Sequence, residues 1–157
     1  MSQELEYEQF PTGKTVVIVS GHFNPIHAGH INHLCEAKKL GDILIVIINN
    51  DKQQILKKGK IIMSEDERMT VVKSIRYVDD IALANDNDPT VIKTIEALAI
   101  LYKGNDLIFA NGGDRKIEED IPERDTCKKY GIKMLFGVGG FIKTFSSTEI
   151  NKLRGAE

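Results

Sequence analysis

The sequence has no tryptophan and only two cysteines, Cys35 and Cys127, which lie far apart in the chain. They form no CxxC pair, and the four histidines add no spacing typical of a zinc site. We therefore expect no metal ion held by the protein's own side chains. The two thiols are expected to be reduced, structural residues of a cytoplasmic protein.

The sequence also lacks a long apolar run and a marked excess of either charge. No apolar segment is long enough to span a bilayer, and the formal net charge of -2 gives no sign of a nucleic-acid or membrane partner. The polar, acidic residues 1–14 do not resemble a signal peptide. A chain of 157 residues suits one domain with a real hydrophobic core. We expect residues 1–14 to form an arm and residues 15–157 to form that domain.

Short β-branched runs alternate with segments of helical spacing along the chain. Strands are predicted at residues 15–20, 43–48, 78–83, 106–110 and 133–136. Helices are predicted from within residues 25–30 to residue 40, and at 64–76, 91–101, 122–130 and 146–153. Ser64 and Glu67 predict a capping box, Thr90 predicts another helix cap, and residues 51–60 are expected to form a lysine-rich loop. This alternation predicts an α/β fold with a parallel sheet.

Three unusual loops follow strands or precede the last helix. They are GHFNPIHAGH at residues 21–30, NGGDR at 111–115 and KTFSSTEI at 143–150. Ligands of parallel sheets bind where the carboxyl ends of the strands open. We therefore expect these loops, although distant in sequence, to converge on one crevice.

The segment HAGH is the strongest candidate for phosphate chemistry. His27 and His30 lie three residues apart, so both imidazoles share one face of a helix that begins there. Gly29 lets a ligand approach the backbone. A helix N-terminus favours an anion, and two imidazoles can donate hydrogen bonds to phosphate oxygens whose charge grows in a transition state. The alternative interpretation is that both histidines cap the helix or lie in the core.

Two further segments could hold anions. Ser146, Ser147 and Thr148 supply hydroxyls and backbone amides at a predicted helix start, although many ordinary helices begin in the same way. The segment LKKGK, at residues 56–60, could close its lysines over a polyphosphate, or those lysines could simply be solvated.

The segment NGGDR directly follows a predicted strand. Gly112 and Gly113 let the backbone approach a flat or charged ligand. Asp114 could accept a hydrogen bond from a ribose or a base, and Arg115 could bind phosphate through two hydrogen bonds. A plain turn would explain the glycines but not the charged residues at a strand end.

Together these segments resemble the HxGH nucleotidyltransferase superfamily, specifically its cytidylyltransferase-like branch. GHFNPIHAGH matches the first signature and SSTEI stands at the second. The segments AKKLGDILIVIINND and ERM…VKSIRYVDDI look like glycerol-3-phosphate cytidylyltransferases, and NGGDR looks like heptose-phosphate adenylyltransferases. The resemblance covers residues 16–153. It implies a Rossmann-like α/β/α sandwich that transfers CMP or AMP from a nucleoside triphosphate to a small phosphorylated polyol or sugar, with release of pyrophosphate.

The resemblance also implies roles for residues. The expected catalytic residues are His27, His30 and Lys58, with Lys60 as the other lysine that could reach the phosphates. The expected nucleotide-binding residues are Gly21, His22, Phe23, Asn24, Gly29, Lys60, Gly112, Gly113, Asp114, Arg115, Ser146, Ser147 and Thr148. Magnesium would bridge the phosphates, mostly through the nucleotide's own oxygens and water. A homodimer is expected on the same basis.

Some positions depart from the family pattern. The family often has Thr or Cys where His22 stands and Asp where Asn24 stands, and the arginine of its RTEG segment has no match here, unless Lys143 or Arg115 supplies that charge. The segments leave both CTP and ATP open, with a slight preference for CTP. A mononucleotide adenylyltransferase that makes NAD or another dinucleotide, and a non-catalytic nucleotide-binding regulator, remain as alternatives.

Overall fold

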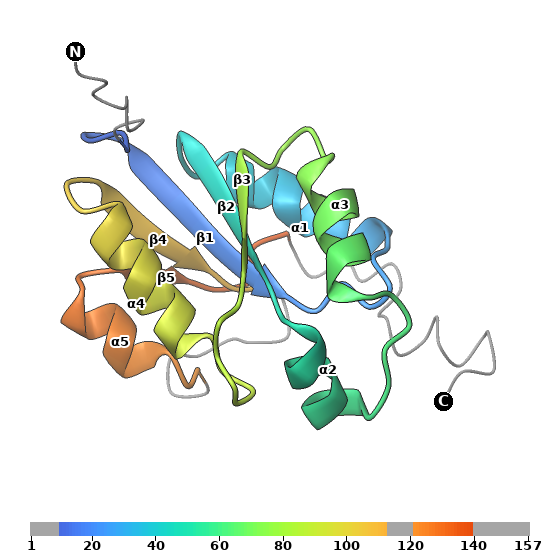
Figure 1. The fold of residues 1–157 in the computed structure, drawn as a ribbon. Helices are drawn as coiled ribbons and strands as arrows, with labels where there is room; N and C mark the ends of the chain where they lie inside the picture. The colour runs from blue at the N-terminus through green and yellow to red at the C-terminus, as the bar shows by residue number, and fades with distance from the viewer. Residues whose placement is uncertain (1–9, 113–120, 140–157) are drawn as a thin grey trace, which may run out of the picture.

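The computed structural model describes residues 10–112 and 121–139, which form a parallel sheet flanked by helices (Figure 1). In chain order the elements are β1 (Thr15–Gly21), α1 (Ala28–Lys38), β2 (Ile43–Ile48), α2 (Asp51–Lys58), α3 (Glu65–Lys73), β3 (Asp80–Leu83), α4 (Ile92–Leu101), β4 (Asp106–Ala110), α5 (Arg124–Lys129) and β5 (Lys133–Leu135). Within the described ranges, no helix has the length and apolar character needed to cross a bilayer.

The five strands lie in the order β3-β2-β1-β4-β5, and every pairing is parallel. Val17 of β1 is paired with Leu44 of β2 on one side and with Ile108 of β4 on the other. The strands β2 and β3 therefore lie on one side of β1, and the later strands β4 and β5 lie on its other side. The point of reversal lies between β1 and β4, which is where ligands of open α/β sheets bind.

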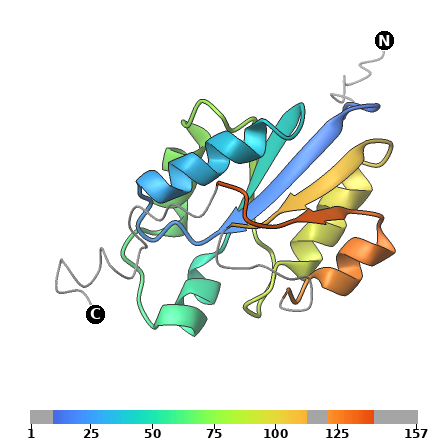
Figure 2. The same ribbon diagram turned by 180° about the vertical axis from the view of Figure 1, so that it is seen from behind.

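Alternate residues of β1 enter two separate cores, as expected for a strand that is buried on both faces. Val16 and Ile18 pack with α4 and α5, whereas Val17 and Val19 pack with α1 and α3. Figures 1 and 2 show these helix pairs on opposite faces of the sheet. The predicted Rossmann-like α/β/α sandwich is confirmed.

The prediction of a loop at residues 51–60 is wrong, because residues 51–58 form the helix α2. Asn50 accepts a hydrogen bond from Gln53 N, and Gln53 Oε1 accepts one from Asn50 N, which completes a capping box. Gly59 ends the helix in the left-handed conformation, with a φ of 75°. The helix buries its glutamines and exposes Ile55 and Leu56. It therefore lacks the usual apolar buried face, and its sequence pattern does not predict a helix.

The N-cap of α4 is Val91 and not the predicted Thr90, although Thr90 Oγ1 accepts a long hydrogen bond from Ile92 N at 3.4 Å. Two acidic side chains, Asp86 and Glu123, hold the start of this helix. The buried carboxylate of Asp86 accepts hydrogen bonds from Lys93 N at 2.7 Å and Thr94 N at 3.2 Å. Glu123 Oε2 accepts one from Val91 N at 3.0 Å. A partner 32 residues away in the sequence cannot be read from local spacing.

The remaining boundaries differ little from the predictions. The helix α1 ends at Lys38, α3 ends at Lys73, and β3 begins at Asp80. Ser64 Oγ accepts from Glu67 N, which confirms the predicted N-cap, whereas the described contacts do not include the return bond from the Glu67 side chain that a capping box requires. The described part of the predicted arm contacts the turn before β4, where Gly13 N donates to Gly104 O. The predicted last helix at residues 146–153 lies outside the described residues.

Candidate active site

The helix α1 begins at the carboxyl end of β1, beside the point of reversal, and its cap is made by two histidines. His27 is the N-cap, and its Nδ1 accepts a hydrogen bond from Gly29 N at 3.0 Å. His30 Nδ1 accepts one from His27 N at 3.1 Å. This is a capping box in which two imidazoles replace the usual hydroxyl and carboxylate. The capping interpretation of the two histidines is therefore confirmed.

This arrangement fixes where each ring carries its proton. An Nδ1 that accepts an N–H is unprotonated, so the proton of the neutral ring must lie on Nε2. In the part of the chain that the structure describes, neither His27 Nε2 nor His30 Nε2 has a hydrogen-bond partner, and both residues are partly exposed. The ring centroids lie 3.9 Å apart. Capping consequently leaves two adjacent Nε2–H donors at the helix start.

Burial keeps both rings neutral. It lowers the pKa of His30 to about 3, with smaller contributions from His27 and His33, and it lowers the pKa of His27. At neutral pH the two rings are therefore neutral hydrogen-bond donors. An anion placed against the Nε2 atoms would favour their protonated forms. The role of His27 and His30 in phosphate chemistry, which the sequence predicts, remains compatible with their role as caps.

Phe23 packs against the His30 ring and is not exposed to a ligand. Its ring is buried and meets the His30 ring edge-on, with centroids 4.9 Å apart. Its φ of 52° is unusual for a residue other than glycine. A Cβ on Gly21 would lie 2.8 Å from Phe23 Cζ. Gly21 therefore leaves the room in which the Phe23 ring packs, and Phe23 in turn positions His30.

We expect Gly21→Ala to lower kcat by about tenfold and the free energy of unfolding by about 1–3 kcal/mol, because the added methyl group overpacks the Phe23 ring. Enzyme kinetics and urea unfolding measure the two effects. The same substitution in a Phe23→Leu background should cost less, since residues in contact are not additive. If Gly21→Ala lowers the free energy of unfolding equally in both backgrounds, the added methyl group does not clash with the Phe23 ring.

Asn24, a predicted nucleotide-binding residue, has a structural partner. Its Oδ1 accepts hydrogen bonds from Ile62 N at 2.9 Å and from Met63 N at 2.7 Å. The side chain is buried. Asn24 therefore holds the connection between α2 and α3 against the segment that leads into α1, and its oxygen is already engaged there.

Arg68 is a residue of this region to which the sequence analysis gave no role. Its side chain is 0% exposed. Nη1 donates to His22 O at 2.8 Å and also to Asn49 O. Nη2 donates to Asp51 Oδ1 at 2.8 Å, and Nε donates to Met63 O at 2.9 Å. One buried guanidinium thus joins the ends of β1 and β2 to the start of α2.

A sequence signal for Arg68 exists. Arg68 and Val72 are four residues apart in a predicted helix, so they share a face, and Val72 is buried. An arginine on the apolar face of a helix is unusual unless its charge has partners. The signal indicates burial but does not indicate which carbonyl groups receive the donors.

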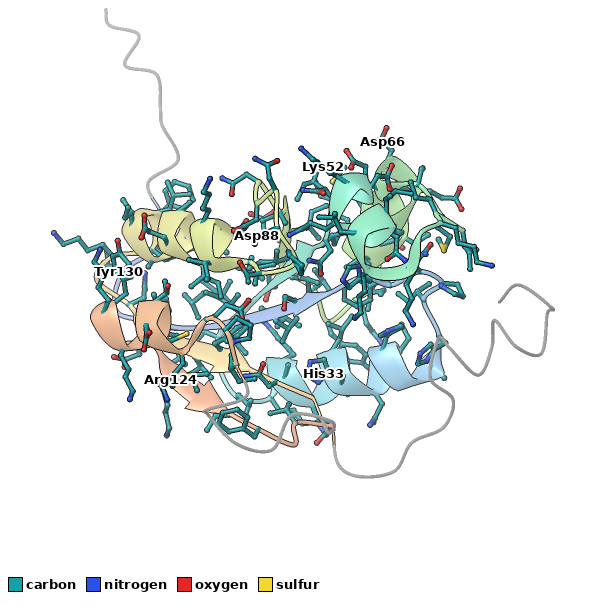
Figure 3. All side chains as sticks on the ribbon, turned by 90° about the horizontal axis from the view of Figure 1, so that it is seen from below. His33, Lys52, Asp66, Asp88, Arg124 and Tyr130 are labelled. Carbon is teal, nitrogen blue, oxygen red and sulfur yellow. The ribbon has the colours of Figure 1, made fainter. Side chains whose placement is uncertain are left out.

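The lysines of residues 56–60 lie at the same edge of the sheet. Lys57 and Lys58 form the last turn of α2, and Lys60 follows Gly59 as an exposed residue. Both Lys57 and Lys58 help to lower the pKa of His22, so their charges lie near the end of β1. Figure 3 looks onto this edge and shows α2, with Lys52 labelled, across β1 from α1.

His33 joins α1 to the segments that follow β4 and β5. Its Nδ1 donates to Val138 O at 2.8 Å, because a carbonyl can only accept. Val138 N donates to Asn111 O at 3.0 Å. Gly139 has a φ of 100°, and a Cβ there would lie 3.1 Å from His33 Cα. These contacts give His33 a structural role.

Gly112 is the one residue of the predicted pair of glycines that the structure describes. A Cβ on it would lie 3.8 Å from His33 Nδ1, so the start of NGGDR lies beside α1. The other predicted site residues outside the described ranges are Gly113, Asp114, Arg115, Ser146, Ser147 and Thr148, and Lys143 also lies there. Among the described residues, no group of three or more His, Cys, Asp or Glu side chains could hold a metal ion.

Comparison with known proteins identifies relatives of this chain. Residues 18–153 match the family described as Cytidylyltransferase-like. The chain is 37% identical over 117 residues to the FAD synthase of Ferroglobus placidus, an alignment that covers 74% of this chain and 70% of that protein. It is 38% identical over 96 residues to the bifunctional protein HldE of Photobacterium profundum, which covers 60% of this chain and 20% of that longer protein.

A solved structure supports the same assignment. The lipopolysaccharide core biosynthesis protein from Thermoplasma volcanium GSS1 is 31% identical, with a TM-score of 0.62, and the match covers 79% of this chain and 94% of that one. The chain belongs to the cytidylyltransferase-like family of nucleotidyltransferases.

Proposed function

We propose that the protein transfers AMP from ATP to the phosphate of a small phosphorylated polyol or sugar and releases pyrophosphate. The observation that carries this proposal is the pair of adjacent Nε2–H donors on His27 and His30 at the start of α1. Donors fixed in this way can stabilise charge that develops on a phosphoryl group, and they do not have to reorganise during the reaction.

In the proposed reaction an oxygen of the acceptor phosphate attacks the α-phosphorus of the nucleotide. The bond from the α-phosphorus to the bridging oxygen breaks, and pyrophosphate leaves with that electron pair. The His27 and His30 donors and the positive end of α1 would stabilise the triphosphate charge. Lys58, on the last turn of α2, would add a positive charge from the opposite side. Magnesium, when bound with the nucleotide, would neutralise phosphate charge mainly through nucleotide oxygens and water.

The relatives favour ATP over CTP, although the sequence segments slightly favour CTP. FAD consists of AMP joined through a pyrophosphate to FMN, so a protein named FAD synthase supports AMP transfer. FMN itself is a phosphorylated polyol chain that carries a flavin. The relative named for lipopolysaccharide core biosynthesis supports a sugar phosphate instead. FAD formation from FMN is therefore the second candidate, in keeping with the dinucleotide alternative.

The test measures pyrophosphate release from ATP and from CTP with FMN, glycerol 3-phosphate and a heptose phosphate, with magnesium present. We expect release with ATP and at least one acceptor, and release about 100-fold slower from a His30→Asn variant that is shown to be folded. Nucleotide binding without release for every pair would favour the non-catalytic regulator. Release with nicotinamide mononucleotide alone would favour the synthesis of NAD.

We also propose that the enzyme works as a homodimer in the cytoplasm. Among the described residues, Cys35 and Cys127 form no disulfide, which is in keeping with a reducing compartment. The dimer is inferred from the family resemblance, and light scattering at micromolar protein concentration measures it directly.

A further inference from the structure

His22 directly follows β1, and other residues hold both its side chain and its backbone. Its ring Nδ1 lies 2.8 Å from Gln54 Oε1 of α2. Gln54 is 2% exposed, although glutamine is rarely buried so completely. The carbonyl of His22 accepts from the buried Arg68. The buried amide of Gln54 orients the ring, and the buried guanidinium of Arg68 holds the backbone that carries it.

The contact with Gln54 gives His22 the opposite tautomer to His27 and His30. An amide oxygen can only accept, so Nδ1 of His22 carries the proton and Nε2 carries a lone pair. Burial, followed by Lys57, lowers the pKa of this ring to about 4, while Gln54 acts to raise it. Within the described residues Nε2 has no hydrogen-bond partner, and His22 is partly exposed.

The ring consequently offers a ligand an acceptor and no donor. A phosphate oxygen is itself an acceptor and does not match a neutral Nε2. The charges of Lys57 and Lys58 act on this ring, so a cation for a phosphate lies nearby without the imidazole. The group that matches Nε2 is a donor on the ligand, and in a polyol or sugar phosphate that donor is a hydroxyl.

The position of His22 indicates which substrate carries this hydroxyl. Nucleotides bind at the point of reversal of such sheets, which here lies between β1 and β4. The His22 ring contacts α2, which follows β2, and β2 lies on the side of β1 opposite β4. The two substrates must meet at the phosphates beside α1. The α2 side is therefore left for the acceptor.

We propose that His22 is a specificity-determining residue whose Nε2 accepts a hydrogen bond from a hydroxyl of the phosphorylated acceptor, and that Gln54 is a positioning residue that fixes its tautomer. This inference rests on the proposed function, because it assumes an acceptor that binds beside the nucleotide. A ribose hydroxyl of the nucleotide has the same chemistry, so the experiment separates the two sources.

The experiment measures binding by calorimetry, without turnover. The acceptor arm compares glycerol 3-phosphate with n-propyl phosphate, and FMN with a flavin whose phosphorylated five-carbon chain has no hydroxyls, each beside a non-hydrolysable ATP analogue. The nucleotide arm compares ATP with its 2′-deoxy and 3′-deoxy forms. We expect the wild type to bind one hydroxylated acceptor about tenfold more tightly than its analogue, the value of one hydrogen bond.

His22→Asn is the matched variant, because its amide can still donate to Gln54 Oε1 while it lacks the Nε2 acceptor. We expect it to bind both members of each pair equally. His22→Gln places an oxygen near the position of Nε2 and should restore part of the preference. Gln54→Ala should weaken the preference without abolishing ATP binding. Thermal melting checks that each variant is folded.

The outcomes separate the explanations. If His22→Asn loses the preference for the hydroxylated acceptor, the proposal is supported. If His22→Asn loses only the preference for ATP over its deoxy forms, the assignment to the acceptor is overturned. An unchanged preference in His22→Asn, no preference in the wild type, or no binding of any acceptor overturns it altogether. A binding preference that depends on His22, without pyrophosphate release, would count against the proposed function and leave this inference standing.

Discussion

Replacing His30 with asparagine is expected to lower kcat by about 100-fold while the protein stays folded, because the change removes the Nε2–H donor. The asparagine Oδ1 can take the place of Nδ1 and accept from His27 N, so the helix cap is kept. The loss should appear mainly in kcat rather than in KM, since a donor to developing charge acts in the transition state. Steady-state kinetics and urea unfolding of the same preparation measure both effects.

Two further variants serve as controls for the His30 prediction. His30→Gln offers a donor near the position of Nε2 and should recover part of kcat. His27→Asn keeps a favoured N-cap residue and should also lose activity without losing stability. A kcat within threefold of the wild type for both asparagine variants would show that the Nε2–H donors do not take part in the reaction.

Replacing Arg68 with alanine is expected to lower the free energy of unfolding by about 3 kcal/mol, among the larger effects of a single change. The substitution leaves the carbonyl groups of His22 and Asn49 without this donor and removes the charge partner of Asp51. Urea unfolding monitored by circular dichroism gives the value. Activity should fall as well, because the ends of β1 and β2 lose their common support.

The matched control for Arg68 is an ion pair of the same kind on the surface. Lys39 pairs with Glu36 at 2.7 Å, with its side chain 66% exposed. We expect Lys39→Ala to leave the unfolding midpoint nearly unchanged, since exposed pairs contribute little. The unfolding midpoint of Arg68→Lys should lie between those of Arg68→Ala and the wild type, because one ammonium cannot reach all four acceptors. Similar midpoints for Arg68→Ala and Lys39→Ala would disprove the buried role of Arg68.

The fold could be predicted from the sequence because its strands carry their own signal. Runs such as Ile43–Ile48 are β-branched without alternation, and such a run indicates a strand buried on both faces. The helix α2 could not be recognised in this way. It buries Gln53 and Gln54 because their amides bond to Asn49, His22 and the loop before α4, and these partners are known only from the fold.

The site was predictable to a similar degree. The spacing of His27 and His30 and their position after a strand predict one shared face, and the structure places the two rings 3.9 Å apart. The tautomers were not predictable. They depend on which backbone N–H meets each Nδ1, and spacing alone gives no such information. Arg68 was missed for a related reason, since its partners are carbonyl groups, which every residue carries.

The histidine capping box also bears on the compromise between stability and activity. Groups at an active site usually destabilise the fold that carries them, so that removing them stabilises the protein. In each imidazole Nδ1 holds the first turn of α1, and Nε2 is left for the phosphate contact that we propose. Selection for a better-formed helix start and selection for better-oriented donors consequently act in the same direction. At these two positions the protein can become more stable without becoming slower.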